Sequence, residues 1–432
     1  MKKLVAVLLT ILMLFTLFQG VLRENVVKAN GQPISEGLEL FYTVNINIGK
    51  SLIHVNINIS NAKSGTFRFI MFYSKTENQE KYISNLTAKQ NSRILTVVYK
   101  GDLTWEVQQL GGTLEVDYDV AKIVPFDYYH FPVPQKLCNV YVDDNGGAIY
   151  GNSFFIVPDS EWDSERYYVS SIKLKFIIPN EWTLITPYID RGDYLEVPRI
   201  TKNLCVDFAQ RRGIYFGKMK FYEEEKVNNC IIKFGVLKSD ENEYTRNMLP
   251  TQKEVQEAVH LNALAVAKLT EIFGENPCPV FPLGNTMTFG DWNFADGPGI
   301  IGGNQFWPYL RYDETVGHLF YSWVREPWNA PVGAHYLICK GIGECFIGNK
   351  LAYEITGDTH YLGKIYSFYL VYKGAQGTKF FEREEIKDAY YKGAVIGMYL
   401  DYIIQKDTAG EKSLEDVLNH LYNKYKNQRF NI

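Results

Sequence analysis

The hydrophobic pattern of this 432-residue chain changes character near residues 240–250, and that change constrains the fold more than any other feature. Before it, short segments alternate apolar and polar residues, as in FYTVNINIGKSLIHVNINIS at 41–60. This alternation is the pattern of half-buried strands, and the clusters of Gly and Asn between the segments are typical of turns. The first half of the chain therefore predicts antiparallel sheets packed as a β-sandwich.

After the change, apolar residues recur at helical spacing. The first helix is predicted to begin at Thr251, which forms a capping-box pattern with Glu254, and to end at Gly274. The other predicted helices cover 312–324, 336–354, 362–373, 384–405, and a last segment that starts at Ser413 with Asp416 completing a cap. We therefore expect an α+β, multidomain protein with an N-terminal β-sandwich domain at 30–240 and a mainly helical domain at 241–432.

The N-terminus has the features of a secretory signal peptide. Lys2 and Lys3 precede an uncharged apolar run at 4–18, and Val27 and Ala29 fit a small-residue cleavage site. The run is shorter than the roughly 20 apolar residues that span a bilayer. Residues 1–29 are thus expected to be a signal peptide, and the chain to be secreted or extracytoplasmic, or anchored to the membrane if the signal stays uncleaved. No stable membrane span is expected after cleavage.

Net charge argues against nucleic-acid binding, and the cysteine spacing argues against a cysteine-based zinc site. The formal net charge is −4, and removal of 1–29 takes away more basic than acidic residues, leaving about −7. Such a chain is a poor nonspecific ligand for nucleic acid, so no nucleic-acid partner is expected. The six cysteines permit disulfides in an exported protein, but their spacing selects no pairing. Because C-x-x-C is absent, a cysteine-based zinc site is not expected.

The segment YDETVGHLF at 312–320 resembles a zinc-peptidase helix whose zinc chemistry has been replaced. The intact pattern is H-E-x-x-H, in which two His four residues apart bind the metal from one helix face. The Glu after the first His polarises the metal-bound water. Here His318 holds the second His position, Glu314 the first, and Thr315 the position of the catalytic Glu.

Longer segments extend this resemblance over nearly the whole chain after residue 29. They include DLTWEVQQLGGTLEVDYDVA, AKLTEIFGENPCPVFP, KGIGECFIGNKLAYE and YYKGAVIGMYLDYIIQKDTAGEKSLEDVLNHLY. In these segments the chain resembles the glycyl aminopeptidase family of gluzincin, thermolysin-like metallopeptidases. The resemblance implies a β-sandwich followed by a mainly α-helical gluzincin domain. The PDZ domain that usually trails in that family is not expected in this chain.

The resemblance also implies roles for single residues. Tyr390 falls at the position of the Tyr that stabilises the transition state. Lys340 falls at the position of the third zinc ligand, which is a Glu in the family. The stretch GGNQF falls at a substrate-binding motif, so Gly302, Gly303 and Gln305 are expected to contact substrate.

The replacements at the metal site favour a metal-free arrangement. A charged Lys donates hydrogen bonds but accepts none, and its ammonium group repels a divalent cation. We therefore expect Lys340 to pair with Glu314 where the metal would lie, beside His318. Thr315 cannot act as a general base at neutral pH. No metal or other cofactor is expected in this arrangement.

One alternative retains a metal. Glu344 lies four residues after Lys340, so Glu314, His318 and Glu344 would form a carboxylate-rich ligand set that suits zinc or manganese. Tyr390 would keep its catalytic role, and zinc is expected only in this alternative.

Three functions are compatible with the sequence. The first is an exported, catalytically inactive aminopeptidase-like protein that binds a peptide or protein in the former active-site cleft. The second is an active, rewired metallopeptidase, and therefore a hydrolase. The third is a structural or adhesion role at the cell surface, carried by the β-domain.

Overall fold

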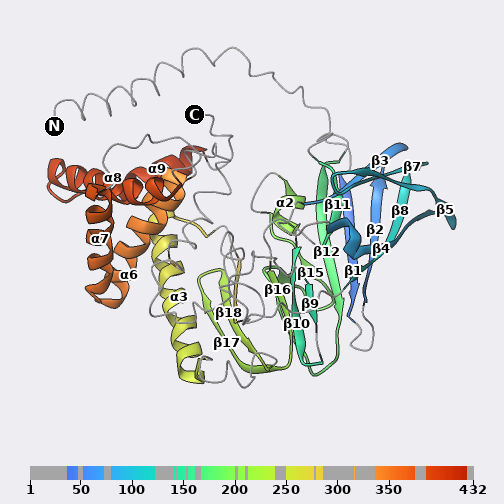
Figure 1. The fold of residues 1–432 in the computed structure, drawn as a ribbon, viewed down its shortest axis with the longest axis horizontal. Coiled ribbons are helices and arrows are strands. Elements are labelled where there is room, and N and C mark those ends of the chain that lie inside the picture. The colour runs from blue at the N-terminus through green and yellow to red at the C-terminus, as the bar shows by residue number, and fades with distance from the viewer. Residues whose placement is uncertain are drawn as a thin grey trace, which may run out of the picture.

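The computed structural model describes residues 37–46, 52–72, 79–121, 140–142, 144–151, 154–160, 167–199, 203–209, 213–238, 250–276, 279–285, 316, 336–374 and 386–425. Its N-terminal part is rich in strands and its C-terminal part in helices, and the two lie at opposite ends of the molecule (Figure 1). This confirms the predicted α+β class. The predicted signal peptide at 1–29 lies outside the described residues.

An eight-stranded sheet forms one layer of the N-terminal part. Along β2, Ile53, Val55 and Ile57 are buried, whereas the alternating His54 and Asn56 face away from the core, as the sequence pattern predicts. In spatial order, the strands are β14 (Ile189–Asp190), β15 (Leu195–Glu196), β12 (Val169–Ile177), β1 (Leu38–Asn45), β2 (Leu52–Ala62), β8 (Gly112–Ala121), β4 (Ile83–Gln90) and β5 (Arg93–Leu95). Neighbours in this sheet are antiparallel except β1 and β12, which are parallel.

Two four-stranded sheets share a hydrophobic cluster with the large sheet, together with the short helix α2 (Leu204–Ala209). One sheet has the order β11 (Ile156–Pro158), β3 (Gly65–Met71), β7 (Thr104–Gln109) and β6 (Val97–Gly101). The other has the order β13 (Thr183–Ile185), β16 (Gly213–Gly217), β10 (Gly146–Tyr150) and β9 (Val140–Val142). A short 3-10 helix, η1 (Gln79–Tyr82), precedes β4. The arrangement is the predicted sandwich, with one core between its layers.

Aromatic rings fill the part of this core next to α2. The Phe208 ring lies 4.2 Å from the Phe155 ring and 4.7 Å from the Tyr42 ring, measured between centroids. The Tyr42 hydroxyl donates a 2.8 Å hydrogen bond to the Ile156 carbonyl oxygen. Burial raises the pKa of Tyr42 well above its ordinary value, so the hydroxyl stays protonated and keeps its role as donor.

Strands β10 and β16 approach each other closely where Gly146 pairs with Gly217. Gly217 has a φ of 151°, and a Cβ atom on it would lie 2.5 Å from both the Asn145 carbonyl oxygen and the Gly146 Cα. Both contacts are with backbone atoms, which cannot move aside as a flexible side chain can. The sheet therefore requires glycine at this position.

We expect Gly217→Ala to lower the free energy of unfolding by about 2–3 kcal/mol, because backbone strain and a steric overlap add. Gly192→Ala is the matched control: φ is 86° there, and an added Cβ would meet nothing within 4 Å. It should cost about 1 kcal/mol from the backbone conformation alone. Urea unfolding of both variants measures the difference, and equal losses would contradict a close approach at Gly217.

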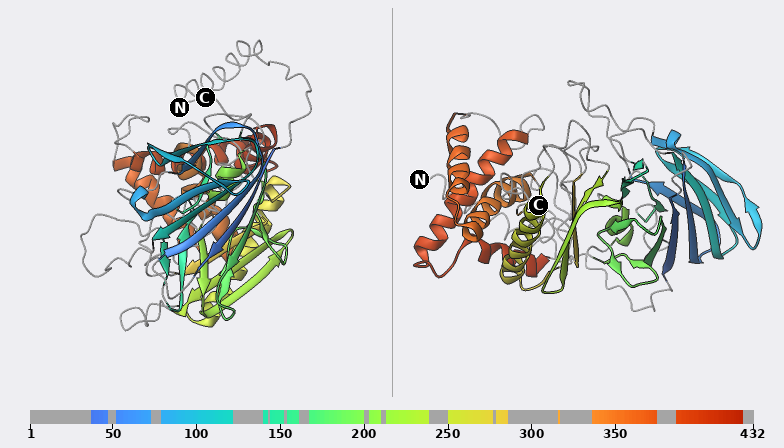
Figure 2. Two further views of the ribbon diagram at one scale, coloured as in Figure 1. Left: turned by 90° about the vertical axis from the view of Figure 1, so that its right-hand side faces the viewer. Right: turned by 90° about the horizontal axis from the view of Figure 1, so that it is seen from below.

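A second hydrophobic cluster joins a three-stranded sheet to the helices. The sheet has the order β17 (Met219–Val227), β18 (Cys230–Leu237) and β19 (Val280–Asn285), with β18 and β19 parallel. Helix α3 (Gln252–Phe273) packs on it, as the right-hand view of Figure 2 shows near the middle of the molecule. Thr251 and Glu254 form both hydrogen bonds of the capping box, and Gly274 ends the helix at φ 79°. Both predicted ends of this helix are confirmed.

The remaining helices also belong to the second cluster. They are η4 (Tyr336–Gly348), α6 (Asn349–Thr356), α7 (His360–Gly374), α8 (Ile386–Asp407) and α9 (Leu414–Tyr425). The helix predicted at 336–354 is thus divided into the π-helical η4 and the α-helical α6. Gly341, Gly343 and Gly348 lie in this segment, and glycine disfavours regular α-helix, which is consistent with the irregular first part. Of the described helices, none combines the length and apolar character needed to cross a bilayer.

Candidate functional site

The predicted zinc-helix positions fall largely outside the described residues. This is the case for Glu314, Thr315 and His318, and also for the expected substrate-binding residues Gly302, Gly303 and Gln305. Val316 is described: it is helical, fully buried and part of the second hydrophobic cluster. The roles of the residues on either side of Val316 stay predictions.

The other three predicted site residues have a described backbone but no described side chain. Lys340 and Glu344 lie in η4, and Tyr390 lies in the first turns of α8. Helical segments with π-type hydrogen bonds are rare in proteins and are frequent at functional sites. The structure therefore shows where these three positions lie along their helices, and that placement can be compared with the prediction.

Helix η4 packs along α8, and two contacts between the η4–α6 segment and α8 share one sequence offset. A Cβ atom on Gly397 would lie 2.9 Å from a ring carbon of Phe346, and Lys350 Nζ lies 3.0 Å from an Asp401 oxygen. Each pair is separated by 51 positions in the sequence. Carried back along the two helices, this offset predicts that the backbone of Lys340 lies near the level of Tyr390 and Tyr391.

Small residues permit this close approach. Gly341 and Gly343 are buried in η4, and Ala394 is fully buried in α8. At Gly397, an alanine would collide with the Phe346 ring. The motif Y-x-K-G-A at the start of α8 thus has a packing role here, since its alanine lies in the same hydrophobic cluster as Val316.

A buried ion-pair network lies ten residues further along the same helices. Lys350 Nζ contacts Glu415 at 2.8 Å and Asp401 at 3.0 Å. Asp401 also accepts hydrogen bonds from the Leu414 amide and from Gln405, both at 2.8 Å. Burial alone would lower the pKa of Lys350, but Glu415 and Asp401 raise it above its ordinary value. The network ties α6, α8 and α9 together.

Sequence reasoning missed this network, although one signal was present. Asp401 interrupts the apolar stretch AVIGMYLDYII of α8. A carboxylate inside an apolar helix face is rarely buried without a partner, so a Lys on a neighbouring helix could have been expected. Nothing in the sequence singled out Lys350 or Glu415 as that partner.

The described residues contain no cluster of three or more His, Cys, Asp or Glu side chains that could hold a metal. The side chains at the predicted ligand positions lie outside the described residues. The sequence places a Glu, a His and a Lys at those positions, and a Thr at the general-base position. This donor set does not fit a catalytic zinc ion, which needs neutral or anionic ligands.

No known family model matches the sequence, and no curated protein matches it significantly. Solved structures do resemble it. An aminopeptidase N family protein from Idiomarina loihiensis superposes with a TM-score of 0.62 at 14% identity, over 89% of this chain and 70% of that one. The M1 zinc metallopeptidase of Deinococcus radiodurans superposes with a TM-score of 0.57 at 12% identity, over 91% of this chain and 88% of that one. A variant of that enzyme bound to a Tyr-Ser-Ala substrate superposes with a TM-score of 0.56 at 12% identity, over 90% of this chain and 87% of that one.

At these identities the likeness establishes the fold alone. The protein has the two-domain fold of the M1 zinc metallopeptidases, which are aminopeptidase N-like gluzincins. This agrees with the gluzincin fold that the sequence resemblance implies, while the glycyl-specific family is not distinguished within the larger group.

Proposed function

We propose that this protein is an exported aminopeptidase-like pseudoenzyme that binds a peptide or protein ligand in the former active-site cleft. One observation carries the proposal: an M1 peptidase fold is combined with Glu314, Thr315 and Lys340 at positions where catalysis needs a His, a Glu and a Glu. Two ligands and the base are replaced together. Export rests on the signal-like sequence at 1–29.

The replacements are chemically consistent with one another. Lys340 supplies the positive charge that the metal would have supplied, and Glu314 offers the carboxylate to neutralise it. The packing of η4, which carries Lys340, along α8, which carries Tyr390, supports a site that keeps its architecture while it loses its metal. In this proposal no zinc ion or other cofactor is bound.

Ligand binding without cleavage is the function such a site can still perform. The Deinococcus enzyme variant was solved with Tyr-Ser-Ala, so the fold accommodates a short peptide. In the proposed site, Gly302, Gly303 and Gln305 contact the peptide, and its backbone pairs with an extended segment of the cleft. Thr315 cannot activate water, so the bound peptide stays intact.

Titration calorimetry and chromatography with Tyr-Ser-Ala and other short peptides test this function. We expect binding to the purified chain without release of an N-terminal residue above the protein-free rate, and no effect of a chelator. Gln305→Ala should weaken binding, whereas Tyr402→Ala, at an exposed side chain of α8, should not. Release of the N-terminal residue that stops on chelation would contradict the proposal and favour the rewired enzyme.

The spacing of Lys340 and Glu344 along η4 is also compatible with the rewired metallopeptidase. In a π-type segment the hydrogen bonds run from residue i to i+5, so the backbone of Glu344 lies just short of one turn beyond Lys340. A metal site of Glu314, His318 and Glu344 is therefore compatible with the backbone. Chelator-sensitive hydrolysis that is lost in both Glu344→Ala and Tyr390→Phe would establish it.

A further inference from the structure

A pocket lies between η4, α6, α7 and α8. Its volume is about 570 Å³, within the range of small-ligand sites. Met398 and Asp401 line it from α8, eight and eleven residues beyond Tyr390, which corresponds to about 12–16 Å along the helix. Glu354, which also lines the pocket, lies fourteen residues after Lys340 and ten after Glu344, so its carboxylate is a further position for a ligand.

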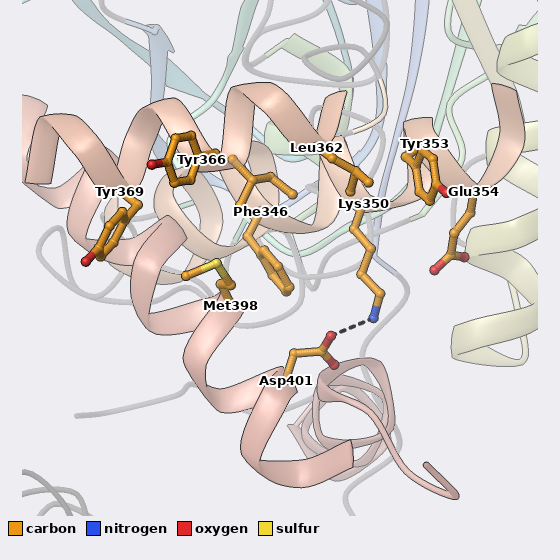
Figure 3. A pocket seen from close by; sticks show the side chains of 10 residues that line it. Phe346, Lys350, Tyr353, Glu354, Leu362, Tyr366, Tyr369, Met398 and Asp401 are labelled. Atoms are coloured by element: carbon orange, nitrogen blue, oxygen red, sulfur yellow. Dashed lines mark hydrogen bonds and ion pairs between the residues drawn. The ribbon is translucent and has the colours of Figure 1, made fainter. Parts of the chain in front are cut away.

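One end of the pocket is apolar and aromatic. Leu362, Tyr366 and Tyr369 recur at helical spacing along α7, and Phe346 and Met398 complete this end (Figure 3). Tyr366 is 60% exposed, so the surface is open to solvent. Aromatic faces bind apolar groups and cations, and the flexible thioether of Met398 adapts to ligand shape.

The charged side chains of Lys350, Glu354 and Asp401 lie at the other end in Figure 3, although apolar atoms make up most of the pocket lining. Around it, the ammonium groups of Lys350 and Lys268 face four carboxylates, those of Asp401, Glu415, Glu354 and Glu271. Negative charge is thus in excess at this end. Lys350 is held between two carboxylates at 3.0 Å or less, so it is not available to an incoming anion.

Glu354 is the carboxylate best placed to receive a cation. Among the described residues it makes one ion pair, a long contact of 3.9 Å with Lys268. Burial raises the pKa of Glu354, and the nearby Glu415 and Asp401 add to this, although Lys350 and Lys268 oppose it. A cation placed against Glu354 would relieve the cost of holding this partly buried charge.

We infer that this pocket binds an amphipathic cation: an ammonium or guanidinium group at Glu354, joined to an apolar or aromatic body that packs on Phe346, Met398 and Tyr366. Charge complementarity selects the cation, and the aromatic end selects the apolar body. The ligand is either a free arylalkyl amine or a basic side chain of a peptide next to an aromatic residue. The inference does not depend on the proposed function.

Calorimetric titration with phenylbutylammonium and with acetyl-Lys-Phe-amide tests the site and distinguishes the two sources. We expect at least one of these cations to bind, and its neutral counterpart, phenylbutanol or acetyl-Met-Phe-amide, to bind at least about tenfold more weakly. Glu354→Gln should reduce cation affinity about tenfold, and Tyr366→Ala by about three- to tenfold.

Two variants serve as matched controls. Glu271→Gln removes a carboxylate that also pairs with Lys268 but does not line the pocket. Tyr402→Ala removes an exposed tyrosine of α8 that does not line it either. Both should leave cation affinity within about twofold of the unaltered chain.

Several results would overturn the inference. These are equal affinity for the cation and its neutral counterpart, equal effects of Glu354→Gln and Glu271→Gln, or no binding of either cation at millimolar concentration. Occupation of this face by a second copy of the chain would also overturn it. Sedimentation would then show a dimer that Tyr366→Ala weakens and that excludes the probes.

Discussion

Replacing Lys350 with Met is expected to lower the free energy of unfolding by about 3–5 kcal/mol, because the change leaves two buried carboxylates without their cation. The Lys350 side chain is 17% exposed, and Asp401 and Glu415 are less exposed than that. Urea unfolding followed by far-UV circular dichroism measures the loss, and the helical signal reports the part of the molecule that this network holds together.

Two comparisons separate loss of the ion pairs from other effects of this substitution. Lys268→Met removes a more exposed cation from the same region and should cost at most about 1 kcal/mol. Combining Lys350→Met with Asp401→Asn and Glu415→Gln should recover part of the stability, since the buried negative charges are gone. Equal losses in Lys350→Met and Lys268→Met would contradict the role of the network.

The pH dependence of the Lys350 contribution has a definite sign. The pKa of Lys350 is raised in the folded protein, so its stabilising effect is complete below the ordinary lysine pKa. It is lost only as the pH rises through the higher folded-state value. The stability difference between the unaltered chain and Lys350→Met should therefore stay constant from neutral to mildly alkaline pH and shrink in strongly alkaline solution.

Phe208→Ala should have a similarly large effect on the N-terminal core, about 3–5 kcal/mol, because it opens a cavity among rings that are fully buried. The Phe208 ring contacts those of Phe155, Tyr42 and Tyr188, at centroid distances of 4.2, 4.7 and 5.8 Å. Removing it deprives three other side chains of their packing partner. Urea unfolding followed by the near-UV signal of these tyrosines measures the effect.

Phe208→Leu is the conservative control and should cost less than about 1.5 kcal/mol, because it keeps most of the volume. Ile94→Ala, at a side chain that is 71% exposed, should change stability by no more than about 0.5 kcal/mol. If Phe208→Ala were no more destabilising than Ile94→Ala, the aromatic cluster would not be the centre of this core.

Local rules made much of the fold predictable. Alternation along β2 predicted its buried face, and Thr251, Glu254 and Gly274 predicted both ends of α3, because capping depends on residues only a few positions apart. The Ser413–Asp416 cap is also confirmed, with a 2.8 Å hydrogen bond from the Ser413 amide. The parallel pairing of β1 with β12 was not predictable, because buried and exposed side chains alternate along a strand in the same way whether its neighbour is parallel or antiparallel.

The site was predictable to a smaller extent. The helices predicted at 336–354 and 384–405 carry Lys340 and Tyr390, and the structure has both residues in helical segments, η4 and α8. The Lys350 network and the pocket beside it could not be predicted. Both depend on contacts between residues 51 to 65 positions apart, and single-sequence patterns do not encode such contacts.

The metal content of the purified protein, measured by plasma mass spectrometry after exposure to excess zinc and desalting, tests the central claim most directly. The account predicts far less than one zinc ion per chain, and uptake of about one when Glu314→His, Thr315→Glu and Lys340→Glu are combined to restore the complete ligand set. About one zinc ion per unaltered chain, lost in Glu314→Ala or Glu344→Ala, would contradict the account and establish a rewired metal site.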